Sequence, residues 1–124
     1  MNDRELLEKA AKAYWGREID DVCSVEWSEL DNCIAYAHCD NQDHNGNDVS
    51  LLWNPLADDG DALRLAVKLN IEFACFDDQQ SVNAGVWSLD GKSWDCMTQY
   101  NGDKLAATRR AIVRSAAAIE KGMT

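Results

Sequence analysis

The segment WNPLADDGDALRLAVKL, residues 53–69, carries the clearest structural signals in this chain of 124 residues. Pro55, the only proline, favours an extended conformation for the residue before it, because its ring crowds an α-helical neighbour. Asp58 or Asp59 can then cap a helix by accepting a free backbone N–H, and the helix should end around Asn70. The apolar residues expected to face the core from this helix are Leu63, Ala66, Val67 and Leu69.

On the N-terminal side of this segment, the sequence predicts a helix, two strands and a polar loop. Residues 4–14 place apolar side chains at helical spacing, and the helix should end near Gly16. Residues 22–27 and 33–39 have the composition and alternation of short strands. Residues 40–50 are dense in Asn and Asp and are expected to form a loop.

On the C-terminal side, three strands and a last helix are predicted. Residues 71–76 form one strand, and residues 82–89 and 92–99 flank Asp90-Gly91, a strong β-hairpin signal. Residues 104–121 are rich in alanine, which favours helix. The order helix–strands–helix–strands–helix indicates one α+β domain over residues 1–124, with helices packed on an antiparallel sheet.

The last helix carries a cluster of arginines. Its expected core stripe is Leu105, Ile112, Ala116 and Ile119. Arg109 falls near the edge of that stripe, and the residues expected opposite it are Arg110, Arg114 and Lys121, among Ala107, Ala117 and Ala118. Two interpretations remain open: an ordinary solvated face in which alanine serves helix propensity, or a surface that a flat ligand can approach closely.

Charge is distributed unevenly along the chain. The net charge is −10, yet residues 18–63 hold twelve acidic and no basic residues, which gives −12, while the rest holds ten acidic and twelve basic residues, which gives +2. This balance disfavours polymeric nucleic acid and anionic membranes as partners, because both draw on clustered Lys and Arg. The acidic segment is interpreted as a solvated flank or a partner surface, and a cationic pocket remains compatible with the remainder.

Targeting signals and catalytic motifs are not evident in the sequence. No apolar run is long enough to span a membrane, and residues 1–8 do not read as a signal peptide, so a cytoplasmic protein is expected. The five cysteines are expected to be small core residues. His38, Cys39 and His44 fit no standard zinc spacing, and neither a nucleophile motif nor a phosphate-binding glycine loop occurs. We expect no catalytic activity, no metal and no cofactor.

Five tryptophans are many for a chain of this length, and most of them should lie in the core or at its rim. Trp87 is of interest because it falls in the predicted strand that precedes the arginine helix. An aromatic face beside an arginine can hold a nucleotide, since the ring stacks on a base and the guanidinium binds phosphate oxygens.

The segment 53–69 and the stretch AATRRAIVRSAA, residues 106–117, resemble small proteins of tailed bacteriophages that carry a phage ABA-sandwich domain. Residues 6–11, LLEKAA, are similar to a lesser degree. One branch of that fold is the Thoeris anti-defence sponge, which sequesters cyclic ADP-ribose signals. The resemblance implies a non-enzymatic protein in the host bacterial cytoplasm that binds a cyclic nucleotide, with neighbouring subunits of a homo-oligomer completing the site.

The resemblance also suggests which residues bind the ligand. It implies Arg114 as the arginine and Trp87 as the aromatic, while Asn101 and Asp103 before the last helix can contact ribose or base. The remaining members of the candidate set are Arg109, Arg110, Trp53 and Asn54. Residues 14–17 and the longer acidic loop depart from the family pattern.

Two other functions remain open from the sequence. The acidic segment 18–63 can imitate nucleic acid and so inhibit a host defence protein that binds it. The chain can also be a small phage enzyme or packaging accessory. A sponge needs an arginine that converges with an aromatic in a concave site, whereas a mimic needs carboxylates spaced like phosphates on a convex face.

Overall fold

The computed structural model describes residues 2–16, 22–42, 45–46, 48–86 and 96–122. Over these ranges the chain is an α+β protein in the predicted order of elements. The helices are α1 (Asp3–Trp15), α2 (Asp59–Leu69) and α3 (Lys104–Gly122). The strands are β1 (Val22–Ser28), β2 (Cys33–Gln42), β3 (Asp48–Trp53), β4 (Glu72–Phe76), β5 (Ser81–Gly85) and β6 (Cys96–Gln99), with a 3₁₀ turn at Asp77–Gln79.

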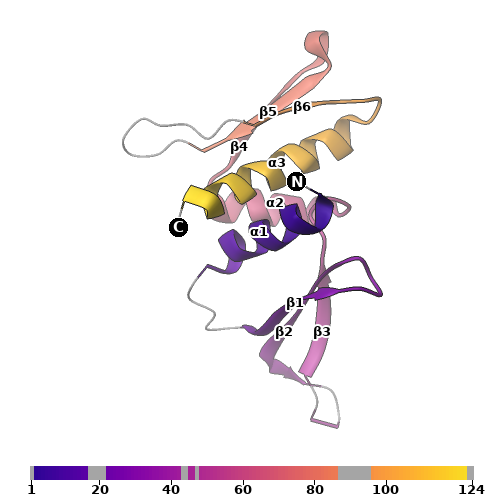
Figure 1. Ribbon diagram of the computed structural model, residues 1–124, viewed down its shortest axis with the longest axis vertical. Helices are drawn as coiled ribbons and strands as arrows, with labels where there is room; N and C mark the ends of the chain where they lie inside the picture. Colours follow the sequence, from indigo (N-terminus) through magenta and orange to yellow (C-terminus); the bar gives the residue numbers. More distant parts are fainter. Residues whose placement is uncertain (1, 17–21, 43–44, 47, 87–95, 123–124) are drawn as a thin grey trace.

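The strands of the described ranges form two antiparallel sheets, where the sequence suggested one. Sheet A has the order β1-β2-β3, and sheet B has the order β4-β5-β6. Figure 1 shows the two sheets at opposite ends of the molecule with the helices between them. The sheets stay separate because the chain enters α2 after β3, crosses the helical layer and starts β4 on its far side.

Local signals explain where α2 begins and ends. Of the two candidate caps, Asp58 is the residue used: its carboxylate accepts a hydrogen bond from the Asp61 backbone N–H at 2.8 Å. At the other end Asn70 adopts a left-handed conformation with φ 56°, which terminates the helix as predicted. The Asn54 backbone N–H donates to the Asp61 carboxylate at 2.9 Å, so the turn after β3 is tied to the first turn of α2.

Sheet A presents an aromatic face to α1. Trp27, Ile34 and Trp53 are cross-strand neighbours on one face of the sheet. The Trp53 ring lies 5.3 Å from the Tyr14 ring and 5.1 Å from the Trp15 ring, both of them at the C-terminal end of α1. At the other end of the sheet, β2 and β3 extend to Gln42 and Asp48, which pair with each other. The hairpin therefore continues into residues that the sequence indicated as loop.

The predicted core stripe of α2 is only partly correct. Ala66 is buried as expected, but the exposed fractions of Leu63 and Val67 are 59 % and 69 %. Ala62 and Leu65 are buried instead, at 3 % and 0 %. The inward face is therefore rotated from the predicted one, because α2 packs against both α1 and α3.

The burial of α3 differs more from the prediction. Ile112 and Ala116 are buried as expected, but Leu105 is 62 % exposed. Ala107 and Ala117, expected on the solvated face, are buried at 4 % each. The reason is that α3 is covered from two sides, by α1 and α2 on one side and by sheet B on the other (Figure 1). Alanine on both faces allows these elements to approach closely.

The cysteines and the second hairpin follow the predictions in part. Cys33 is buried, whereas Cys75 is exposed and so is not a core residue.

β5 and β6 pair antiparallel as expected, with Ala84 opposite Cys96. The predicted turn at Asp90-Gly91 lies outside the described residues.

Candidate functional site

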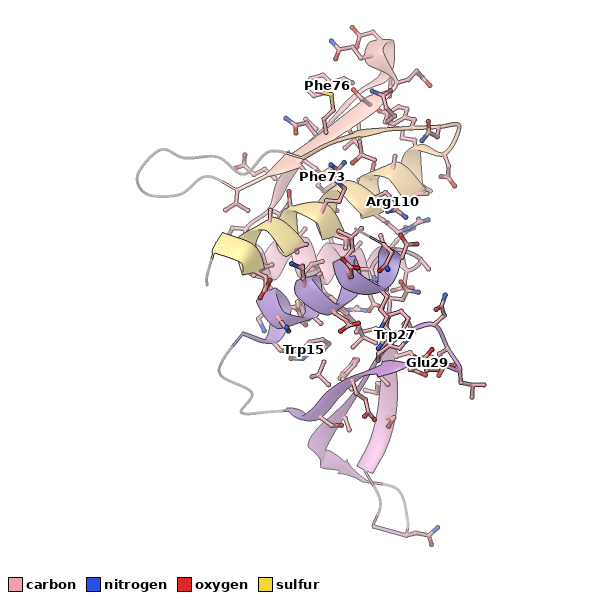
Figure 2. All side chains as sticks on the ribbon, viewed as in Figure 1. Trp15, Trp27, Glu29, Phe73, Phe76 and Arg110 are labelled. Carbon is pink, nitrogen blue, oxygen red and sulfur yellow. The ribbon has the colours of Figure 1, made fainter. Side chains whose placement is uncertain are left out.

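The three arginines of α3 extend in different directions and do not converge. Arg109 lies against the loop that enters α2, Arg110 contacts α1, and Arg114 contacts β6. A ligand site can therefore contain only one of these three arginines. Figure 2 labels Arg110 between α1 and α3.

Arg109 is the most firmly held of the three. Its Nε donates to the Leu56 carbonyl oxygen at 2.9 Å, and its guanidinium donates to the Asp59 carboxylate at 2.7 Å. The Arg109 side chain is 17 % exposed, whereas that of Asp59 is 67 % exposed. The bond to a backbone carbonyl fixes the guanidinium without neutralising its charge, and the ion pair screens it.

Arg109 lines a cavity of about 360 Å³ between α2, α3 and β4. We call this cavity the α2–α3–β4 groove. The residues that line it include Leu63, Phe73, Cys75, Lys104, Leu105 and Arg109. Leu63, Phe73 and Leu105 are 59 %, 46 % and 62 % exposed, so the groove presents apolar surface to solvent. Figure 2 labels Phe73 beside α3 on sheet B.

Lys104 provides the second positive charge of the groove. Its Nζ lies 3.0 Å from Oδ1 of Asp77 and 6.0 Å from the centre of the Tyr100 ring. The Tyr100 hydroxyl donates to the same Asp77 oxygen at 2.8 Å. Asp77 follows β4 directly, so this network joins the turn between β4 and β5 to the start of α3.

The pKa values in this network shift as the contacts require. The hydrogen bond from Lys104, followed by that from Tyr100, lowers the pKa of the Asp77 carboxyl. The same carboxylate raises the pKa of Lys104, so both members are charged near neutral pH. Burial and then the bond to Asp77 raise the pKa of the Tyr100 hydroxyl well above its usual range, so it remains a donor.

Arg110 and Asn54 lie together in a second, more polar cavity. It has a volume of about 260 Å³, and Asn32 and Asp3 also line it. Arg110 donates to the Asp3 carboxylate at 2.8 Å. No aromatic residue is among the residues that line this cavity in the described part of the chain, so it lacks a surface on which a base can stack.

Arg114 is held by neutral groups. Its guanidinium donates to the Met97 carbonyl oxygen at 2.8 Å and to the Thr98 hydroxyl at 3.0 Å. Both partners belong to β6, which begins next to residues 87–95. Trp87, the aromatic expected beside Arg114, lies outside the described residues, so this pairing stays a prediction.

The remaining predicted site residues have structural positions. Trp53 is 2 % exposed and belongs to the core. Asn101 is an exposed turn residue with φ 50°. The Asp103 carboxylate accepts the Ala106 backbone N–H at 3.0 Å and so caps the start of α3.

Sequence reasoning missed Lys104, Phe73 and Cys75 as groove residues. One local signal pointed to Lys104. It stands beside Leu105, a large apolar residue, at the start of a helix, where side chains are commonly exposed. No local pattern indicated Phe73, because the α3 residues that line the groove with it lie 31 or more positions away in the sequence.

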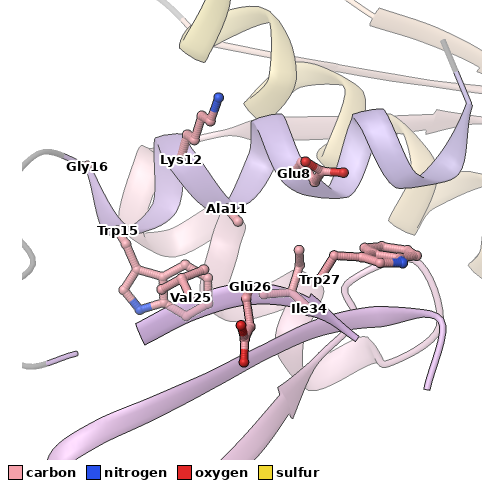
Figure 3. Close-up of a pocket in the computed structure, with 9 residues that line it drawn as sticks. All are labelled: Glu8, Ala11, Lys12, Trp15, Gly16, Val25, Glu26, Trp27 and Ile34. Atoms are coloured by element: carbon pink, nitrogen blue, oxygen red, sulfur yellow. The ribbon is translucent and has the colours of Figure 1, made fainter. Parts of the chain in front are cut away.

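A third cavity separates α1 from sheet A. It has a volume of about 240 Å³, and the rings of Trp15 and Trp27 lie at its two ends (Figure 3). Ala11 forms its roof on α1, and Val25 and Ile34 form its floor. The guanidinium of Arg4 lies 5.2 Å from the centre of the Trp27 ring. This slot is smaller than the groove, and the charged residues Glu8, Lys12 and Glu26 also line it.

Comparisons of the chain with protein-family models, with curated proteins and with solved structures give no match.

Within the described ranges, no helix has the length and apolar character needed to cross a membrane. The same ranges contain no group of three or more His, Cys, Asp or Glu side chains arranged to hold a metal ion. His44 and the side chains of His38 and Cys39 are outside what the structure describes.

Proposed function

We propose that this protein binds a small cyclic nucleotide in the α2–α3–β4 groove and sequesters it without turnover. The observation that carries the proposal is the presence of Arg109 and Lys104 beside an exposed aromatic residue, Phe73, in one concave site. A basic and aromatic combination suits a nucleotide, since the ring stacks on the base while the cations bind phosphate oxygens.

The size of the groove agrees with this ligand class. Pockets for small ligands commonly have volumes of roughly 300–1,000 Å³ and apolar walls with a few polar groups. The groove, at about 360 Å³, lies at the lower end of that range. An open site of this size leaves part of a dinucleotide uncovered, which a neighbouring subunit of a homo-oligomer would cover.

The biological setting of the proposal comes from the resemblance of residues 53–69 and 106–117 to tailed-phage proteins. In that setting the protein is phage-encoded, acts in the host bacterial cytoplasm and lowers the concentration of an immune signal. Tight binding is sufficient for this role, because a sponge only has to keep the free signal below its threshold.

Isothermal titration tests the proposal, with cyclic ADP-ribose isomers and cyclic di- and trinucleotides as probes. We expect binding in the micromolar range or tighter by at least one of them, and a loss of about tenfold or more in R109A. Phe73→Ala should also weaken binding, because base stacking contributes about 1–3 kcal/mol. If none of the probes binds, the proposal is wrong.

Arg114→Ala serves as the comparison for Arg109→Ala. Both variants remove one α3 arginine, but only Arg109 lines the groove. If the groove is the site, R114A retains most of its affinity. If R114A abolishes binding and R109A does not, the site instead lies at Arg114 and its predicted partner Trp87.

A second candidate function has support from the position of the acidic segment. Residues 18–63 contain all of sheet A, which lies across the helical layer from sheet B (Figure 1). Glu26, Glu29 and Asp31 are exposed there. A nucleic-acid mimic would use this sheet, so charge reversal of Glu26 should abolish capture of a host protein while leaving nucleotide binding unchanged.

A further inference from the structure

The two cations of the α2–α3–β4 groove stand at opposite edges of its floor. At about 100° per residue, Lys104 and Arg109 differ by about 140° around α3 and by about 7.5 Å along its axis. Leu105, Thr108 and Ile112 fall within the arc between them, and all three line the groove. A ligand that lies on this floor therefore meets one positive charge on each side.

Each cation is already paired with one carboxylate from another element. Asp59 at the start of α2 binds Arg109 at 2.7 Å, and Asp77 after β4 binds Lys104 at 3.0 Å. Both carboxylates are largely exposed, at 67 % and 69 % of their side-chain surface. Exposed ion pairs such as Lys104–Asp77 contribute only about 0–1 kcal/mol. The Arg109 side chain is only 17 % exposed, but its partner Asp59 is open to solvent, so an incoming anion can reach and replace either carboxylate.

Each cation has a second contact that does not involve its carboxylate. The Nε of Arg109 remains bonded to the Leu56 carbonyl oxygen, which leaves the outer guanidinium nitrogens available. Lys104 keeps the Tyr100 ring beside it. The displaced Asp77 also keeps its bond from the Tyr100 hydroxyl, so release of the ligand restores the original contacts.

We propose that Asp59 and Asp77 act as internal competing anions in the α2–α3–β4 groove, so that a ligand with two anionic groups displaces both carboxylates and contacts both cations. A monoanion displaces one carboxylate and leaves the other cation screened. A dianion whose charges flank an apolar or aromatic body displaces both and contacts the floor as well. This inference rests on the proposed function and specifies the ligand class of the same groove.

The test uses Asp59→Asn and Asp77→Asn, which remove the charge but keep the shape of the side chain. An asparagine oxygen at position 77 can still accept from the Tyr100 hydroxyl. Asp78→Asn is the matched control, because it makes the same charge change beside Asp77, and among the described residues no hydrogen bond or ion pair is found for Asp78. Thermal unfolding of each variant checks that the fold is intact.

Cyclic di-AMP is the dianionic probe whose phosphates flank an aromatic body, pyrophosphate is a compact probe with two anionic groups and no base, and cyclic AMP is the monoanionic probe. Binding is followed by titration calorimetry and by the NMR signal of the Arg109 Nε–H. We expect each single variant to bind cyclic di-AMP and pyrophosphate about two- to fivefold more tightly than wild type, the range that a weak ion pair implies. The double variant should bind cyclic AMP more tightly than wild type by a similar factor, about two- to fivefold, because a monoanion displaces only one carboxylate.

The outcomes separate this inference from the proposed function. If D59N and D77N bind pyrophosphate no more tightly than D78N does, the two aspartates are not competing anions, even where wild type binds a nucleotide. If both variants bind pyrophosphate more tightly while no variant binds any nucleotide, the competition is supported and the proposed function is wrong.

Discussion

At the scale of single residues, Asp61 joins the turn after β3 to the first turns of α2. Its carboxylate accepts the backbone N–H of Asn54 at 2.9 Å and the guanidinium of Arg64 at 2.7 Å, and the residue is only 8 % exposed. The turn that contains Pro55 thereby keeps a fixed position against α2. Arg109 depends on this position, because its Nε binds the Leu56 carbonyl in the same turn.

Asp61→Ala is expected to lower the free energy of unfolding by about 2–3 kcal/mol, because it leaves a part-buried N–H without its charged acceptor. Asp61→Asn should cost less, since the amide oxygen still accepts from Asn54. Urea unfolding followed by circular dichroism measures both. Equal losses in the two variants would show that the charge and not the hydrogen bond stabilises the turn.

At the scale of elements, α3 is the helix against which α1, α2 and sheet B pack. Ala111 and Ala116 have no exposed surface, and Val113 is also fully buried. Side chains this small let α1 and sheet B approach the helix backbone from two sides. Close packing of this kind leaves no room for added volume.

Ala111→Leu is therefore expected to destabilise the protein by about 1–3 kcal/mol through overpacking. Val67→Leu is the comparison, because Val67 on α2 is 69 % exposed and should tolerate the larger side chain within about 0.5 kcal/mol. The midpoints of thermal unfolding report the difference. If Ala111→Leu left the midpoint of thermal unfolding unchanged, α3 would have unfilled space beside Ala111.

At the scale of the whole molecule, the two sheets have unequal attachments to the helical layer. β5 packs directly on α3, and Val82 and Ala84 in it are buried. Sheet A contacts the helices through α1, across the slot between Trp15 and Trp27. The acidic segment contains sheet A, so repulsion among its carboxylates further weakens this end of the molecule.

Native-state hydrogen exchange should consequently find sheet A less protected than the centre of α3. Amides of β1 and β3 are expected to exchange through local opening, and those around Val113 only through global unfolding. Added salt should slow exchange in sheet A more than in α3, because it screens the acidic segment. Uniform protection across both regions would contradict this order of stability.

Much of the local structure could be predicted from sequence patterns. The cap at Asp58 and the stop at Asn70 follow from the chemistry of single side chains, and the order of helices and strands follows from their periodicities. The candidate site was predictable only in part. Arg109 was selected because it lies on the arginine-rich helix, but its groove partners Lys104 and Phe73 were not, since they come together only through packing.

The sequence by itself determined the α+β class, the bounds of the three helices and the separation of charge along the chain, because these depend on neighbours within a few residues. Tertiary structure decided the rest. An alanine-rich helix is compatible with a solvated surface or with close packing on two sides, and only contacts between distant segments select the second. Those same contacts place two cations and one aromatic ring around a groove. The reason is that α2, α3 and β4 are separate in the sequence and meet only in the folded protein.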